Sequence, residues 1–114
     1  MPAKRPEAEH TVAEHFILLV ACEFGPENIE GAKAVEEILD KTPGWCRYLQ
    51  STWLICTPET PLELTTHFTP HLTPADRLLI IKVDAPFNGW LPREAWDWMR
   101  EYILREPAPR PARS

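Results

Sequence analysis

Two runs of apolar residues are typical of β-strands that are buried on both faces. Residues 15–23 read HFILLVACE and residues 77–83 read RLLIIKV, so apolar side chains occupy both sets of alternating positions. A strand with one solvated face would instead alternate apolar and polar residues. We therefore predict that both runs lie inside a sheet that is covered on its two sides.

Two shorter β-rich runs lie close together within residues 45–57 and predict a hairpin that turns near Ser51. A tight turn at that point would place Tyr48 opposite Trp53 and Cys46 opposite Ile55, with apolar groups on both faces.

Helical spacing of apolar residues predicts three helices, over residues 27–41, 60–72 and 92–104. Proline is well placed to begin the first two, with Thr60 as the cap of the second. Pro70 is expected to end or kink that second helix near Thr69.

The order of these elements is β-α-β-β-α-β followed by a C-terminal helix, which is the order of the ferredoxin-like split βαβ motif. We predict an α+β fold with a four-stranded antiparallel sheet and one additional C-terminal helix. Two helices cover only one face of such a sheet. The C-terminal helix would cover part of the other face and a second copy of the chain the rest, so we expect a homodimer.

The prolines also divide the chain. Of the 13 prolines, several lie in two end segments that lack apolar periodicity. We expect a flexible N-terminal head over residues 1–14, a ferredoxin-like domain over residues 15–104 and a flexible Pro/Arg-rich tail over residues 105–114.

Composition narrows the classes of function. The chain has 114 residues, room for one domain, and a net charge of −5. The head contributes −1 and the tail +2, so the folded body carries −6. This balance disfavours a broad nucleic-acid-binding face but leaves room for a local basic patch. No apolar run is long enough to span a bilayer or to act as a signal peptide, so we expect a cytoplasmic protein without a membrane partner.

Three cysteines, Cys22, Cys46 and Cys56, occur without CxxC spacing. Neither a disulfide framework nor a zinc site is indicated, and we expect reduced, buried thiols.

Residues 45–55, WCRYLQSTWLI, carry a resemblance to a known family. Together with the DRL triplet at residues 76–78, the aliphatic strand that follows it, and the tryptophans at positions 90 and 96, this segment resembles the SinR-like branch of the CRISPR-associated protein-two superfamily. The resemblance covers residues 15–104.

The resemblance implies a ferredoxin-like homodimer with packed sheets. Nucleases of that superfamily place an Asp at the end of the first strand, where two copies hold a divalent metal at the dimer axis. The matching position is Glu23, which would be the catalytic residue and the ligand of Mg²⁺ or Mn²⁺. Glu is one methylene longer than Asp, which disfavours efficient catalysis. Tyr48, Trp53 and Ile55 of the hairpin are expected at the dimer interface.

Three hypotheses of function stay open. The first is a homodimeric binding or assembly protein in a nucleic-acid or phage-defence context, with Arg47 and Arg77 as contacts to nucleic acid. The second is a metal-dependent endonuclease with paired Glu23. The third is a non-catalytic regulatory module that binds a protein partner through its acidic surface.

Overall fold

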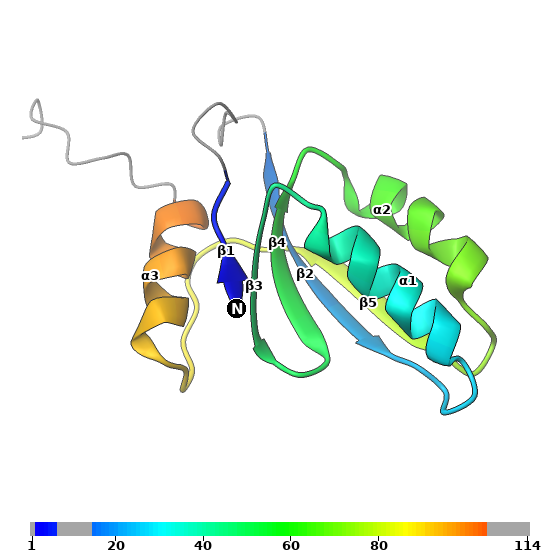
Figure 1. The fold of residues 1–114 in the computed structure, drawn as a ribbon. Coiled ribbons are helices and arrows are strands. Elements are labelled where there is room, and N and C mark those ends of the chain that lie inside the picture. The colour runs from blue at the N-terminus through cyan, green and yellow to red at the C-terminus, as the bar shows by residue number, and fades with distance from the viewer. Residues whose placement is uncertain (1, 7–14, 105–114) are drawn as a thin grey trace, which may run out of the picture.

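The apolar runs form neighbouring strands of one antiparallel sheet. The computed structural model describes residues 2–6 and 15–104, and Figure 1 shows their arrangement. The five strands lie in the order β1-β3-β4-β2-β5. Their bounds are β1 (Ala3–Lys4), β2 (Phe16–Glu23), β3 (Gly44–Leu49), β4 (Thr52–Thr57) and β5 (Arg77–Lys82). The predicted α+β class with an antiparallel sheet is confirmed.

The prediction of four strands is wrong, because part of the N-terminal head adds a fifth. In β1, Ala3 lies opposite Cys46 and Lys4 opposite Trp45, so β1 pairs with the outer edge of β3. A two-residue strand is held by its backbone and by the edge it covers. It therefore needs no apolar alternation and leaves no periodic signal in the sequence.

The first helix is shorter than predicted. Helix α1 (Ile29–Asp40) begins two residues after the expected start, because the side chain of Asn28 accepts a hydrogen bond from the Gly31 backbone N–H and caps the helix. Pro26 therefore lies before the helix and not in its first turn.

The second helix begins where the sequence predicts and ends earlier. Thr60 caps α2 (Pro61–Phe68) in a reciprocal capping box with Glu63. A short 3₁₀ helix, η2 (Thr69–His71), follows directly and accommodates Pro70. The tighter turn replaces the last α-helical turn because proline cannot donate to the carbonyl four residues before it.

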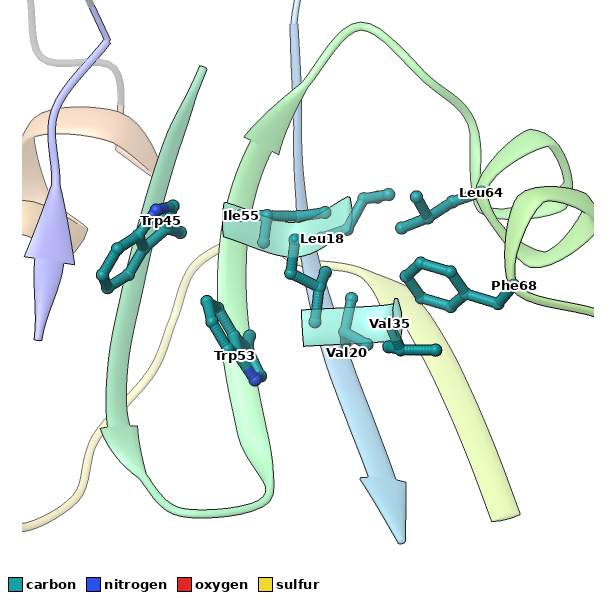
Figure 2. Packing of buried hydrophobic residues seen from close by; sticks show 9 residues of the cluster. Leu18, Val20, Val35, Trp45, Trp53, Ile55, Leu64 and Phe68 are labelled. Carbon is teal, nitrogen blue, oxygen red and sulfur yellow. The ribbon is translucent and has the colours of Figure 1, made fainter. Parts of the chain in front are cut away.

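Helices α1 and α2 cover one face of the sheet, here called the α1/α2 face. Val35 of α1 and Phe68 of α2 pack against Leu18 and Val20 of β2, and all four side chains are at most 1% exposed (Figure 2). On the same face the rings of Trp45 and Trp53 meet edge to face, with centroids 5.2 Å apart. This cluster is the main core.

The third helix, α3 (Arg93–Tyr102), covers part of the opposite face, here called the α3 face. Ile17 alternates with Leu18 along β2 and belongs to a second cluster with Cys46, Cys56 and the buried side of α3, which includes Trp98. The expectation that the C-terminal helix covers part of the second face is confirmed.

The hairpin register differs from the predicted one by one residue. Cys46 lies opposite Leu54, and Trp45 lies opposite Ile55, with a β-bulge or similar irregularity between Cys46 and Leu49. A bulge adds a residue to one strand only, so counting outward from a tight turn gives the wrong partners. Cys46 therefore lies on the α3 face, and Trp53 and Ile55 lie on the other.

Trp45 and Trp98 are both buried, but they differ in hydrogen bonding. Among the described residues, the Trp45 indole N–H is the buried side-chain donor without a partner, whereas the Trp98 indole donates to the Lys4 carbonyl at 3.0 Å. We predict that Trp98→Phe loses about 1 kcal/mol more unfolding free energy than Trp45→Phe, because only the first change removes a hydrogen bond. Urea unfolding of both variants measures the difference, and equal losses would contradict it.

Candidate functional site

One end of the sheet brings together two of the residues singled out from the sequence. Glu23, the last residue of β2, lies directly opposite Arg77, the first residue of β5. Directly opposed residues share a face, so both belong to the α3 face, and both are exposed. The Arg77 guanidinium donates to the Pro74 and Asp76 carbonyls at 2.9 Å each, which fixes its direction.

The carboxylate of Asp76 holds the two loops on either side of this pair. It accepts hydrogen bonds from the Gly25 N–H, the Thr73 N–H and the Asn28 amide, each at 2.7 Å. The two backbone hydrogen bonds are the largest causes that lower the pKa of this carboxyl, and Asn28 lowers it further. Asp76 therefore ties the loop after β2 to the loop before β5.

Asn28 extends the same network into α1. Its side-chain oxygen caps the helix at Gly31, while its amide nitrogen donates both to Asp76 and to the His71 carbonyl at 3.0 Å. A Cβ on Gly31 would lie 2.2 Å from that carbonyl oxygen, so only glycine fits there. The start of α1, the 3₁₀ helix and the Glu23–Arg77 end are thus one hydrogen-bonded unit.

On the exposed α3 face, this end of the sheet carries the Glu23 carboxylate beside the Arg77 guanidinium, while the Asp76 carboxylate is engaged between the loops. In residues 2–6 and 15–104, no three His, Cys, Asp or Glu side chains gather in a group that could hold a metal ion. A divalent ion at Glu23 would need further ligands, such as the Glu23 carboxylate of a second copy. The positive charge of Arg77 beside it opposes a cation and favours an anionic group such as a phosphate.

Arg47 and Arg77 do not converge. Arg47 lies on β3, which β4 and β2 separate from β5, a distance of about 14 Å at the usual strand spacing. Its guanidinium stacks on the Trp53 ring, 4.7 Å from the centroid, pairs with Glu36 at 3.3 Å and donates to the Gln50 carbonyl. These contacts lie on the α1/α2 side, so the two arginines belong to different surfaces.

The three residues expected at a dimer interface are also separated. Trp53 and Ile55 are buried in the main core, at 4% and 0% exposure, and neither side chain is available to a partner. Tyr48 is half-buried on the α3 face, beside the cluster that contains α3.

A different set of residues forms an apolar surface on the α3 face. Helix α3 does not cover the part over β2 and β5, where Leu19 lies opposite Ile81 and Ala21 opposite Leu79. Leu54 of β4, also opposite Leu19, is half-buried at the border of the α3 cluster. Leu79 is 54% and Ile81 47% exposed, which is high for aliphatic strand residues. We call Leu19, Ala21, Leu54, Leu79 and Ile81 the open patch.

The three cysteines are buried, as the sequence predicts. Burial raises the pKa of Cys22, and it raises that of Cys46 to about 11. Thiols of this kind are poor nucleophiles at neutral pH, which disfavours cysteine-based catalysis.

No protein-family model, curated protein or solved structure matches this chain. None of the helices within the described residues is long and apolar enough to cross a membrane.

Sequence reasoning missed the Asp76 network and the open patch for different reasons. The network joins residues up to 51 positions apart in the chain, and no local pattern marks them. The open patch had a signal, because the apolar residues of 77–83 fall in both sets of alternating positions. The register that assigns Leu79 and Ile81 to the uncovered side comes only from the pairing of β5 with β2.

We predict that Asp76→Asn lowers the urea midpoint of unfolding clearly, while the matched change Asp40→Asn at the exposed end of α1 does not. The asparagine amide would face backbone N–H donors that now bind a carboxylate. Folding lowers the pKa of the Asp76 carboxyl. The ionised carboxylate therefore stabilises the folded state in full at pH values above the unfolded pKa of about 3.9.

The same effect is lost as the pH falls through the lower pKa of the folded state. The difference between wild type and Asp76→Asn should therefore be constant from pH 7 to about pH 5 and shrink below about pH 4. A difference that persists unchanged in strong acid would contradict this assignment.

Proposed function

We propose that this chain is a homodimeric assembly or binding protein of ferredoxin-like architecture. In this proposal two copies pack through the open patch, in the nucleic-acid or phage-defence context that the SinR-like resemblance implies. The observation that carries the proposal is the part of the α3 face that no described helix or strand covers. Leu79 and Ile81 stand exposed there beside Leu19 and Leu54, on a sheet whose other face carries the main core.

Several features support this architecture and this mode of assembly. Without β1, the strand order is β3-β4-β2-β5, with α1 and α2 together on one face (Figure 1). In a two-fold symmetric dimer each copy contributes the same surface, so an apolar patch is complementary to itself. The folded body is acidic, which favours a contact through the uncharged centre of the patch over one through the outer faces of the helices.

We predict that Ile81→Glu weakens the dimer at least tenfold, since it places two like charges in the apolar contact, about 1.4 kcal/mol or more. The matched control is Leu62→Glu on α2, where the leucine is 76% exposed on the opposite side of the sheet. Sedimentation velocity over a concentration series measures both. A monomeric wild-type protein at every concentration would overturn the proposal.

A second candidate function is a metal-dependent nuclease, and the position of Glu23 favours it. Glu23 is exposed at the end of β2, on the same face as the open patch. Packing of two copies through that face would bring two Glu23–Arg77 pairs to one interface. The carboxylates could then share a Mg²⁺ or Mn²⁺ ion, with Arg77 beside the phosphate.

For this second function we predict cleavage of RNA or DNA that needs Mg²⁺ or Mn²⁺ and falls at least a hundredfold in Glu23→Gln, because removing a shared ligand removes the ion. Glu27→Gln, an exposed change in the following loop, is the matched control. Equal cleavage by Glu23→Gln and wild type would exclude this site.

If the protein binds nucleic acid without cleaving it, Arg77→Ala should weaken salt-dependent binding more than Arg47→Ala. Arg47 is already engaged with Glu36 and Trp53. Fluorescence polarisation at low and high salt measures both variants.

A further inference from the structure

The two edges of the sheet end in different ways. On one side the chain covers the edge of β3 with β1, and the Arg47 backbone N–H donates to the Pro2 carbonyl at 2.6 Å. On the other side β5 is the last strand, and within residues 2–6 and 15–104 no further strand pairs with it. All six residues of β5 keep an unbroken register with β2. An edge strand of this length, without a bulge or a proline, is a template for another strand.

The register shows which backbone groups of β5 face outward. The Val83 N–H donates to the Ile17 carbonyl at 2.8 Å, one pair beyond the last residue of β5. In an antiparallel ladder, hydrogen-bonded pairs alternate with pairs that are not hydrogen-bonded. The odd-numbered residues of β5 therefore bond to β2. The backbone N–H and C=O groups of the even-numbered residues point away from the sheet, and these residues are Leu78, Ile80 and Lys82.

The side chains of β5 define what an added strand would contact. Leu79 and Ile81 are exposed on the α3 face, whereas Leu78 and Ile80 are half-buried against the main core on the other face. Cross-strand neighbours on one face interact directly, and an aliphatic pair is favourable. A segment with aliphatic residues at alternate positions would therefore bury the outer sides of Leu79 and Ile81.

The charges at the two ends of β5 narrow the choice of partner. Arg77 and Lys82 are both exposed, and neither forms an ion pair with another described residue. Lys82 gives the stronger signal, because Glu23 already lies beside Arg77. Antiparallel pairing with a second β5 would bring Arg77 of one copy near Lys82 of the other, which like charges oppose. A carboxylate at each end of the added segment would instead be complementary to both cations.

We propose that the open edge of β5 binds an extended segment of a partner protein, which adds to the sheet as an antiparallel strand. Aliphatic side chains of that segment lie beside Leu79 and Ile81, and acidic side chains lie beside Lys82 and Arg77. Main-chain hydrogen bonds supply the affinity in this mode of recognition, and alternate side chains supply the specificity. The proposal goes beyond the dimer described above, because it rests on outward backbone groups and not on packing through the face of the sheet.

A short peptide tests this with the full chain. The probe is the hexapeptide EVTVTE with blocked ends, whose valines would lie beside Ile81 and Leu79 in the antiparallel register. At about 5 mM probe, enough to saturate a site with a Kd in the low-millimolar range, hydrogen exchange at the Leu78 and Ile80 amides should slow at least tenfold. Unchanged exchange at these two amides would overturn the proposal.

A pair of methylated probes separates backbone pairing from apolar adhesion. Methylation of the backbone nitrogen of the third residue removes the donor to the Ile80 carbonyl and should abolish the protection. Methylation of the fourth residue, whose N–H points away from β5, is the matched control and should leave the protection unchanged. Equal protection by both methylated probes would contradict strand addition.

The charge of the probe tests the partner chemistry. The probe KVTVTK, with lysine in place of both glutamates, should bind at least threefold more weakly at low salt, and the difference should shrink at high salt. Equal binding of the two probes would overturn the acidic assignment.

The protein without peptide tests a second copy as the occupant. Exchange at the Leu78 and Ile80 amides should not change with protein concentration, because a dimer through the open patch leaves the outward backbone groups of β5 free. Protection that grows with protein concentration would assign the edge to a second copy and overturn the proposal.

Discussion

The fold depends on the burial of β2 from both sides. Its alternate residues, such as Ile17 and Leu18, belong to two different clusters, so the strand is stable only if each face of the sheet is covered. Two helices complete the α1/α2 face, and α3 completes only part of the other. The open patch is the part of the second face that α3 does not cover. A second copy of the chain would cover it with the same chemistry that α3 already uses.

A single carboxylate holds together the loops at the Glu23–Arg77 end of that sheet. Asp76 gathers two backbone N–H groups and the Asn28 amide, and Asn28 in turn caps α1. Glu23 ends β2 and Arg77 begins β5, so each lies next to one of the two loops that Asp76 joins. The pairing of β2 with β5 sets Glu23 opposite Arg77, and the Asp76 hydrogen bonds hold the loops on either side, so a change at Asp76 would disturb the pair without touching it.

The elements with strong periodicity were predictable, and the parts fixed by long-range contacts were not. Thr60 and Pro61 start α2 where the sequence places them, because a cap and a first-turn proline act within four residues. The bulge after Cys46 shifts the hairpin register and places Cys46 on the face opposite Trp53 and Ile55, which pair with β2 in the core. The short strand β1 forms because an edge of β3 is available, which no local pattern of residues 3–4 encodes.

The position of α3 divides its face of the sheet into two surfaces of different chemistry. The helix packs against Ile17, Cys46 and Cys56, at the end of the sheet where β2 begins and β4 ends. On one side it leaves aliphatic residues of β2, β4 and β5, which suit a flat, self-complementary contact. On the other it leaves a groove beside β1 and β3 that Tyr48, Glu94 and the cations Lys4 and Arg5 line. A dimer through the open patch would leave the groove accessible, because the two surfaces lie over different strands.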